Sequence, residues 1–178
     1  MQMPVAELGS GSSIREGTGW RWLPVALGVI VLDQLVKAWM VANLKPYEPH
    51  HVLPVLDITL MFNTGAAFSF LDRGPGWQVW GFTVLAVAVS VGILVWLRKV
   101  GSRTQRLLAL ALTLILGGAL GNVIDRIRIG HVVDFIFPHW NNHWFPAFNL
   151  ADSAITIGAI LLAWDALMEG RAAKRAAK

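Results

Sequence analysis

Residues 117–152 read GGALGNVIDRIRIGHVVDFIFPHWNNHWFPAFNLAD and lie between two apolar segments. The stretch carries a group of acidic and amide side chains, namely Asn122, Asp125, Asp134, Asn149 and Asp152. A carboxylate at the end of an apolar helix is costly, because the hydrocarbon part of a bilayer does not solvate charge. These residues therefore indicate a functional site rather than an ordinary connecting loop.

The composition is that of a membrane protein. The 178 residues are 55% hydrophobic and 15% charged, with a mean hydropathy of +0.54, which is too apolar for a typical soluble domain. The absence of cysteine excludes a cysteine nucleophile, a zinc–thiolate site and disulfides. The basic residues gather at the ends of apolar segments, which favours orientation in a membrane over nucleic-acid binding.

Four segments are long enough to cross a hydrocarbon layer of about 30 Å, and we place them at about 22–42, 77–97, 107–124 and 150–168. The predicted fold class is a mainly α membrane protein, a four-transmembrane-helix bundle. Residues 20–168 form one predicted domain. Residues 1–19 are expected to be a disordered polar N-terminus, and residues 169–178 a basic cytoplasmic tail.

The regions between these segments predict a small extracytoplasmic β-sheet. Pro46, Pro49 and Pro54 exclude a long helix, and HVLPVL and DITLMFN have the pattern of short strands. HVVDFIF, at 131–137, predicts another strand, which Pro138 and the residues after it should end. NTGAAFSFLDRGPG, at 63–76, predicts a short interfacial helix.

Basic residues are distributed unequally between the two sides of this predicted bundle. Ten lie in the N-terminal segment, the 98–106 loop and the C-terminal tail: Arg15, Arg21, Arg98, Lys99, Arg103, Arg106, Arg171, Lys174, Arg175 and Lys178. Four lie on the opposite side: Lys45, Arg73, Arg126 and Arg128. The excess predicts that both termini are cytoplasmic and that the aspartates lie near the outer face.

Two features inside the predicted spans concern helix packing. Asp33 and Lys37 are spaced i, i+4, which predicts a structural ion pair near the interface with Lys37 reaching outward, direct catalysis being the alternative. Gly117 and Gly121 have the small-xxx-small spacing that lets helices approach closely, next to Asn122.

Asp134 and Asp152 are candidates for a catalytic pair. Prolines between them exclude one continuous helix, but a strand followed by a returning helix would bring them together. Two carboxylates that share a site hold one proton between them, so one can act as a base and the other as an acid. Structural or ion-conducting carboxylates are the alternatives that the spacing leaves open.

Five motifs occur in order between the predicted spans: DQLVK at 33–37, NTGAAFS at 63–69, GNVIDR at 121–126, GHVVDF at 130–135 and FNLAD at 148–152. In these motifs the chain closely resembles the bacterial lipoprotein signal peptidases, or signal peptidases II, over residues 20–168. The resemblance implies an intramembrane aspartic endopeptidase with four transmembrane helices, located in the bacterial inner membrane. It implies removal of signal peptides from diacylglyceryl-modified prolipoproteins, with cleavage before the lipidated cysteine. It also implies that no metal or other cofactor is used and that globomycin-type lipopeptides inhibit the enzyme.

The same resemblance assigns roles to individual residues. Asp134 and Asp152 match the catalytic pair. Substrate contacts are implied for Asn63, Asn122, Arg126 and Asn149. We expect the protein to act as a monomer among membrane lipids, without nucleic acid.

Several of these residues also have simpler interpretations. Asp125 is expected to be structural, in a salt bridge with Arg126 at the end of the third helix, and Arg126 is otherwise an interfacial anchor. Asn149 is otherwise only a helix cap. His131, His139 and His143 lie in a region of strand and turn character and not on a helix, so they do not form the helical i, i+4 pair of a zinc protease, and no metal is predicted there.

Two other classes of protein compete with the peptidase interpretation. A proton-coupled transporter or channel subunit would also carry intramembrane carboxylates, but it predicts internal repeats or helices broken at mid-membrane. The sequence contains no evident repeat, and its carboxylates lie at the ends of spans. A purely structural membrane subunit would leave the outer aspartates and asparagines without a role.

Overall fold

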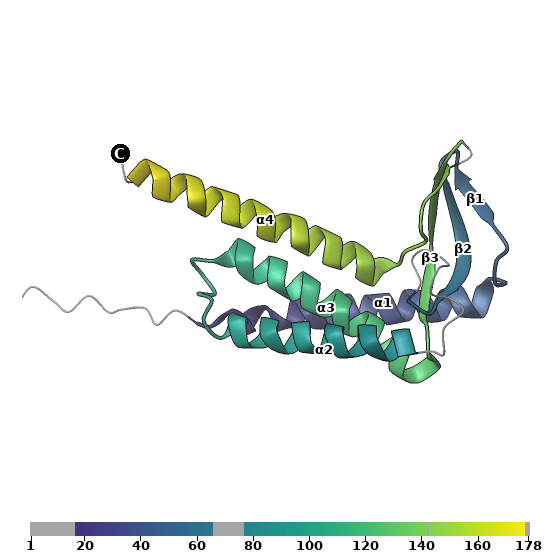
Figure 1. Ribbon diagram of the computed structural model, residues 1–178, viewed down its shortest axis with the longest axis horizontal. Helices are drawn as coiled ribbons and strands as arrows, with labels where there is room; N and C mark the ends of the chain where they lie inside the picture. Colours follow the sequence, from purple (N-terminus) through teal and green to yellow (C-terminus); the bar gives the residue numbers. More distant parts are fainter. Residues whose placement is uncertain (1–16, 66–76, 142, 177–178) are drawn as a thin grey trace, which may run out of the picture.

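The computed structural model describes residues 17–65, 77–141 and 143–176. Its helices are η1 (Gly19–Trp22), α1 (Leu23–Asn43), α2 (Trp77–Leu97), α3 (Arg106–Ile129) and α4 (Leu150–Ala176). Its strands are β1 (His50–Leu53), β2 (Leu56–Asn63), β3 (Val132–Trp140) and β4 (His143–Trp144). The helices α1 to α4 are all long and apolar enough to cross a membrane. In Figure 1 the sheet stands at one end of the helices, and the 98–105 connection and the C-terminal end of α4 lie at the other.

The four expected spans are confirmed, and two of the helices are longer than expected. Helix α3 continues past residue 124 to Ile129 and ends at Gly130, whose φ of 76° is the left-handed conformation common at helix ends. Arg126 and Arg128 lie in its last turn, where positive charge is favourable. Helix α4 continues past residue 168 to Ala176, because its last turns are rich in alanine, lysine and arginine, which are strong helix formers.

Helix α3 is the centre of the bundle. In its most apolar window 67% of the residues are buried, against 17% in each of the other three helices. Close packing explains this burial: a Cβ on Gly117 would lie 2.8 Å from the Ala26 carbonyl oxygen of α1, and one on Gly118 would collide with the Ala151 carbonyl of α4. The close approach expected from the glycine spacing is therefore confirmed, with Gly118 as a further contact.

The outer faces of the helices are apolar. On α1, Leu27, Val31, Leu35 and Trp39 follow one another at i, i+4 spacing, and each exposes about half or more of its surface. Such a stripe is a poor surface in water and a normal one against lipid chains. The polar side chains of the same helix, Asp33 and Lys37, are buried on its opposite side.

The sheet is antiparallel with strand order β1-β2-β3-β4, so the predicted strands are confirmed. Met61 of β2 is paired with Asp134 of β3, and Leu56 with Pro138. Contrary to expectation, Pro138 does not end its strand, and β3 continues to Trp140. Leu56 is the first residue of β2, so the missing N–H of Pro138 falls where this ladder ends and disrupts little.

The chain before α1 is attached to the connection between α2 and α3. Gly19 N–H donates to Val100 O (2.8 Å), and Ser102 N–H donates to Gly17 O (2.8 Å). Residues 17–19, which the sequence placed in the polar N-terminus, thus belong to the folded part. Residues 1–16 of that segment lie outside the described residues, as does most of the predicted interfacial helix (66–76).

Candidate active site

Asp152 lies in the first turn of α4, and Asn149 caps that helix. The Asn149 Oδ1 atom accepts a hydrogen bond from Asp152 N–H (2.9 Å), and Asp152 Oδ2 accepts one from Asn149 N–H (3.3 Å). This reciprocal arrangement is a capping box, which satisfies two free N–H groups at a helix start. It also determines where the Asp152 carboxylate lies.

Asp134 lies on β3, and two amide side chains hold its carboxylate. Asn149 Nδ2 donates to Asp134 Oδ1 (2.7 Å), and Asn63 Nδ2 donates to Asp134 Oδ2 (2.9 Å). Asn149 is therefore bonded to both aspartates, through its side-chain amide to Asp134 and through its cap to Asp152. The structure brings together the two carboxylates that the sequence paired.

The surroundings of Asp134 favour its protonated form. Its side chain is 1% exposed, and burial raises the pKa of its carboxyl to about 7. The hydrogen bond from Asn63 opposes this rise in pKa, while the neighbouring charge of Asp152 adds to it. At neutral pH, Asp134 is consequently able both to hold a proton and to release it.

A tight turn after β2 orients Asn63. Its Oδ1 accepts a hydrogen bond from Gly65 N–H (2.8 Å), which leaves its Nδ2 directed at Asp134. Gly65 has φ +106°, and a Cβ there would lie 2.7 Å from the Phe82 ring. Only glycine combines this conformation with so close an approach.

Asn122 of α3 connects the catalytic candidates to a second polar cluster. Its Nδ2 donates to Asp152 Oδ1 (2.7 Å), while its Oδ1 accepts from Lys37 Nζ (3.0 Å) and from Asn149 Nδ2 (3.1 Å). Its side-chain amide thus lies between the carboxylates on one side and a buried lysine on the other.

Lys37 is the centre of that second cluster. Its Nζ lies 2.8 Å from Asp33 Oδ2 and 2.8 Å from Asp125 Oδ2. The predicted Asp33–Lys37 ion pair is present, but Lys37 does not reach outward, since it is only 3% exposed. With Asn122 as a third acceptor, the three ammonium protons all have partners inside the bundle.

The predicted salt bridge between Asp125 and Arg126 is wrong, because Asp125 pairs with Lys37. Arg126 Nη1 makes a long hydrogen bond to Asn122 O (3.5 Å), and its guanidinium carbon lies 5.8 Å from the centre of the Phe82 ring. The Arg126 Nε donor is buried and has no partner among the residues that the structure describes. A buried free donor this close to Asn122 is available to a ligand.

A cavity of about 460 Å³ opens beside Asp152. Its lining is largely apolar and consists of Phe148, Asp152, Ser153, Thr156 and Ile157. One catalytic candidate is therefore accessible from a space large enough for a peptide side chain or part of a lipid chain.

Sequence reasoning missed one residue of this network and two residues of a separate cluster. Gln34 donates from Nε2 to Asp125 Oδ1 (2.8 Å) and stands next to Asp33, so the DQLVK motif already contained it. Among the three histidines considered for metal binding, His139 lies instead with His51 and Asp57, which no sequence pattern linked. His131 packs its ring on Phe62 at 4.6 Å.

Comparison with known proteins shows the family of the chain. The family model described as signal peptidase (SPase) II matches residues 25–168, which include both aspartates, the sheet and all of the bundle except the start of α1 and the last turns of α4. The chain belongs to the signal peptidase II family. Membership makes it a membrane protease with four spanning helices, and nothing in the comparisons supports the transporter alternative.

Individual relatives are similar over most of their length. A lipoprotein signal peptidase of Pseudomonas fluorescens is 54% identical over 149 residues, covering 83% of this chain and 86% of the relative. One from Pseudomonas aeruginosa is 54% identical over 148 residues, covering 82% and 86%. A solved bacterial membrane enzyme superimposes with a TM-score of 0.73 at 31% identity, covering 85% of this chain and 90% of its own.

Proposed function

We propose that this signal peptidase II family member is an aspartic endopeptidase of the bacterial inner membrane. Its substrates are prolipoproteins that carry a diacylglyceryl-modified cysteine, and it cleaves the peptide bond just before that cysteine. The observation that carries the aspartic mechanism is the position of Asn149, which bonds to both Asp134 and Asp152. A single asparagine that donates to both carboxylates, from its side-chain Nδ2 to Asp134 and from its backbone N–H to Asp152, is the arrangement that a shared-proton pair needs.

The number of protons that the two carboxyl groups share supports peptide hydrolysis. With the pKa of Asp134 near 7, the pair carries one proton at neutral pH. The ionised carboxylate takes a proton from a water molecule as the oxygen of that water attacks the scissile carbonyl carbon. The protonated carboxyl then gives its proton to the leaving nitrogen as the C–N bond breaks. The pair ends with one proton, ready for another turnover.

Substrate contacts are proposed for Asn63, Asn122, Arg126 and Asn149. The three asparagines already touch the carboxylates, so they lie at the place where a scissile amide would be held. Arg126 offers a free Nε donor to a substrate carbonyl or to the lipid headgroup region. The same contacts would hold a globomycin-type lipopeptide, and apolar substrate groups would enter the cavity beside Asp152.

The orientation proposed for the protein places both termini in the cytoplasm and the active site near the periplasmic face. The basic 98–106 loop and the C-terminal end of α4 lie at the end of the bundle away from the sheet, in agreement with the excess of positive charge there (Figure 1). Because the chain has no cysteine, single introduced cysteines can test this directly. Asn141→Cys should react with a membrane-impermeant maleimide in intact spheroplasts, whereas Arg103→Cys and Lys174→Cys should react only after lysis. Labelling in the reverse order would refute the orientation.

The deciding experiment is cleavage by the purified protein in detergent. Incubation with a diacylated prolipoprotein should release the signal peptide, while the unlipidated precursor should be cut far more slowly. EDTA should leave the rate unchanged. Absence of cleavage of the lipidated substrate by folded protein would refute the proposed function, and loss of cleavage in EDTA by protein that stays folded would refute a metal-free mechanism.

A further inference from the structure

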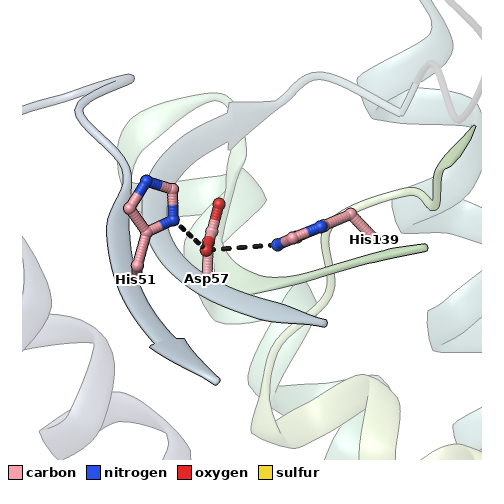
Figure 2. A group of neighbouring side chains, drawn as sticks. All are labelled: His51, Asp57 and His139. Carbon is pink, nitrogen blue, oxygen red and sulfur yellow. Dashed lines mark hydrogen bonds and ion pairs between the residues drawn. The ribbon is translucent and has the colours of Figure 1, made fainter. Parts of the chain in front are cut away.

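Three strands of the outer sheet each contribute one metal-binding side chain to a single cluster: His51 from β1, Asp57 from β2 and His139 from β3. Figure 2 shows the two imidazole rings approaching the carboxylate from opposite sides. Asp57 Oδ1 lies 2.7 Å from His51 Nδ1 and 3.3 Å from His139 Nε2. None of these residues takes part in the proposed peptidase chemistry.

The register of the strands places the three side chains on one face. Asp57 is directly paired with His51 on one side and with Phe137 on the other. His139 follows Phe137 by two residues, and side chains two apart on a strand point to the same face. The juxtaposition is therefore a property of the sheet backbone.

The carboxylate of Asp57 is incompletely satisfied. The residue is 0% exposed, yet Asp57 Oδ2 has no hydrogen-bond partner within the described part of the chain. A buried carboxyl group with one free oxygen, placed between two imidazole rings, offers the oxygen and nitrogen ligands that a metal ion takes.

We propose that His51, Asp57 and His139 bind one divalent transition-metal ion of the zinc class. Two imidazole nitrogens and one carboxylate oxygen are a known zinc ligand set, and such a set leaves a fourth position for water. Tetrahedral bonds of about 2.0–2.1 Å put neighbouring ligand atoms about 3.3–3.4 Å apart. The Asp57–His139 distance of 3.3 Å already fits. The Asp57–His51 distance has to lengthen from 2.7 Å, and the His51 side chain is 75% exposed and able to move.

The proposed ion would act on the sheet and not on the scissile bond. Asp134 is paired with Met61, four residues along β2 from Asp57, which corresponds to about 13 Å at the usual rise per residue. A metal at Asp57 would link β1, β2 and β3 on the outer side of the active site. Its binding is independent of the peptidase proposal, because it can be measured without substrate.

Binding can be tested with the full chain in detergent, purified without a polyhistidine tag and stripped with EDTA. Zn²⁺ should bind one to one in calorimetry and raise the melting temperature, and Co²⁺ should give the visible absorption of a tetrahedral site. His51→Ala should weaken Zn²⁺ binding at least tenfold, as should His139→Ala. His51→Ala alters an exposed side chain, so its fold should persist even if Asp57→Asn fails to fold.

The matched control is His50→Ala, since His50 is the neighbour of His51 on β1 and lies outside the cluster. It should bind Zn²⁺ like the wild type. Absence of one-to-one binding by the wild-type protein would overturn the proposal and leave the cluster as a hydrogen-bond network. Equal binding by wild type and His51→Ala would overturn it as well, by placing the ion elsewhere.

Discussion

The bundle contains two adjacent polar clusters that use the same kind of residue in opposite ways. In the first, the ammonium group of Lys37 contacts the carboxylates of Asp33 and Asp125 directly. In the second, Asp134 and Asp152 receive hydrogen bonds from amide groups, and no ion pair with either of them occurs among the described residues. A cation stabilises the ionised form of a buried carboxylate, whereas neutral amides leave its protonation open. The first cluster is therefore suited to structure and the second to proton transfer.

The two clusters are also connected in a specific way. Asp33 Oδ1 accepts a hydrogen bond from Ala151 N–H (3.0 Å), and Asp125 Oδ2 accepts one from Val133 N–H (3.3 Å). Ala151 directly precedes Asp152, and Val133 directly precedes Asp134. The first cluster (Asp33, Lys37 and Asp125, here called the charge-paired cluster) thus holds the backbone immediately before each member of the proposed catalytic pair. Changes in the two clusters should accordingly separate stability from turnover.

The largest effect is expected from removing either carboxyl of the second cluster, in which amide groups hold Asp134 and Asp152. Asp134→Asn and Asp152→Asn should each reduce cleavage by about 10³-fold or more, because an amide at neutral pH neither accepts nor gives the proton. The double variant should be no slower than either single variant, since the pair acts on one water and one peptide bond. Single-turnover cleavage of a lipidated prolipoprotein in detergent measures this.

Asp165→Asn on α4 is the control and should cleave at the wild-type rate. All variants should remain folded and should still bind a globomycin-type inhibitor, with a smaller loss than in turnover. Considerable cleavage by either single variant would remove that aspartate from the pair.

Substitutions in the charge-paired cluster should lower the free energy of unfolding. Lys37→Met leaves two buried carboxylates without their cation and should cost about 3–5 kcal/mol of unfolding free energy. Asp33→Ala should cost less, because Lys37 keeps Asp125 and Asn122. Thermal unfolding in detergent, together with the abundance of each variant in the membrane, measures the loss of stability in both variants.

The exposed pair of Lys45 and Glu48 is the matched control. Its charged atoms are 3.8 Å apart in solvent, so Lys45→Met should change stability by no more than about 1 kcal/mol. If Asp33→Ala kept full stability and lost turnover, Asp33 would have to be moved from the structural cluster to the catalytic one.

The pH dependence tests the raised pKa of Asp134. If the pair works with one proton, cleavage should fall by about tenfold for each pH unit above 7, as Asp134 loses that proton. A rate that stayed level between pH 7 and about pH 9 would contradict this assignment.

Stability should depend on the same group. The folded-state pKa is about 7 and the ordinary value is 3.8, so between these values the folded protein holds a proton that the unfolded chain has released. Stability should therefore decrease as pH rises from about 4 to about 7, and this contribution should be absent from Asp134→Asn. Unfolding free energy measured between about pH 4 and pH 7 in the wild type and in Asp134→Asn isolates the contribution of Asp134.

The smallest effect should come from Asn149→Ser, which separates the two roles of Asn149. Serine is also a good N-cap, so the helix start should persist, and unfolding free energy should fall by about 1–3 kcal/mol because the buried acceptors of Nδ2 lose their donor. The Nδ2 donor to Asp134 is lost, and cleavage should fall by about tenfold or more. Equal cleavage by Asn149→Ser and wild type would reduce Asn149 to a helix cap.

Much of this architecture follows from the sequence because length and hydropathy are local properties. The four spans, the strands at HVLPVL, DITLMFN and HVVDFIF, and the placement of Asp125 and Asp152 near the ends of spans could all be predicted. Each depends on whether a segment of a given length can be buried in lipid or paired in a sheet, and neighbouring residues decide that. The five ordered motifs similarly pointed to the family that the comparisons then established.

Only the tertiary structure decided which polar atoms meet. Lys37 could have extended to the interface, but the close packing of α1 and α3 places it between Asp33 and Asp125. Asn149 was predictable as a cap, while its bond to Asp134 depends on how β3 and α4 come together. The cluster of His51, Asp57 and His139 depends on the register of three strands. Side-chain partners from distant segments are selected by packing and by the need to satisfy buried charge, and the spacing of residues along the chain does not contain that information.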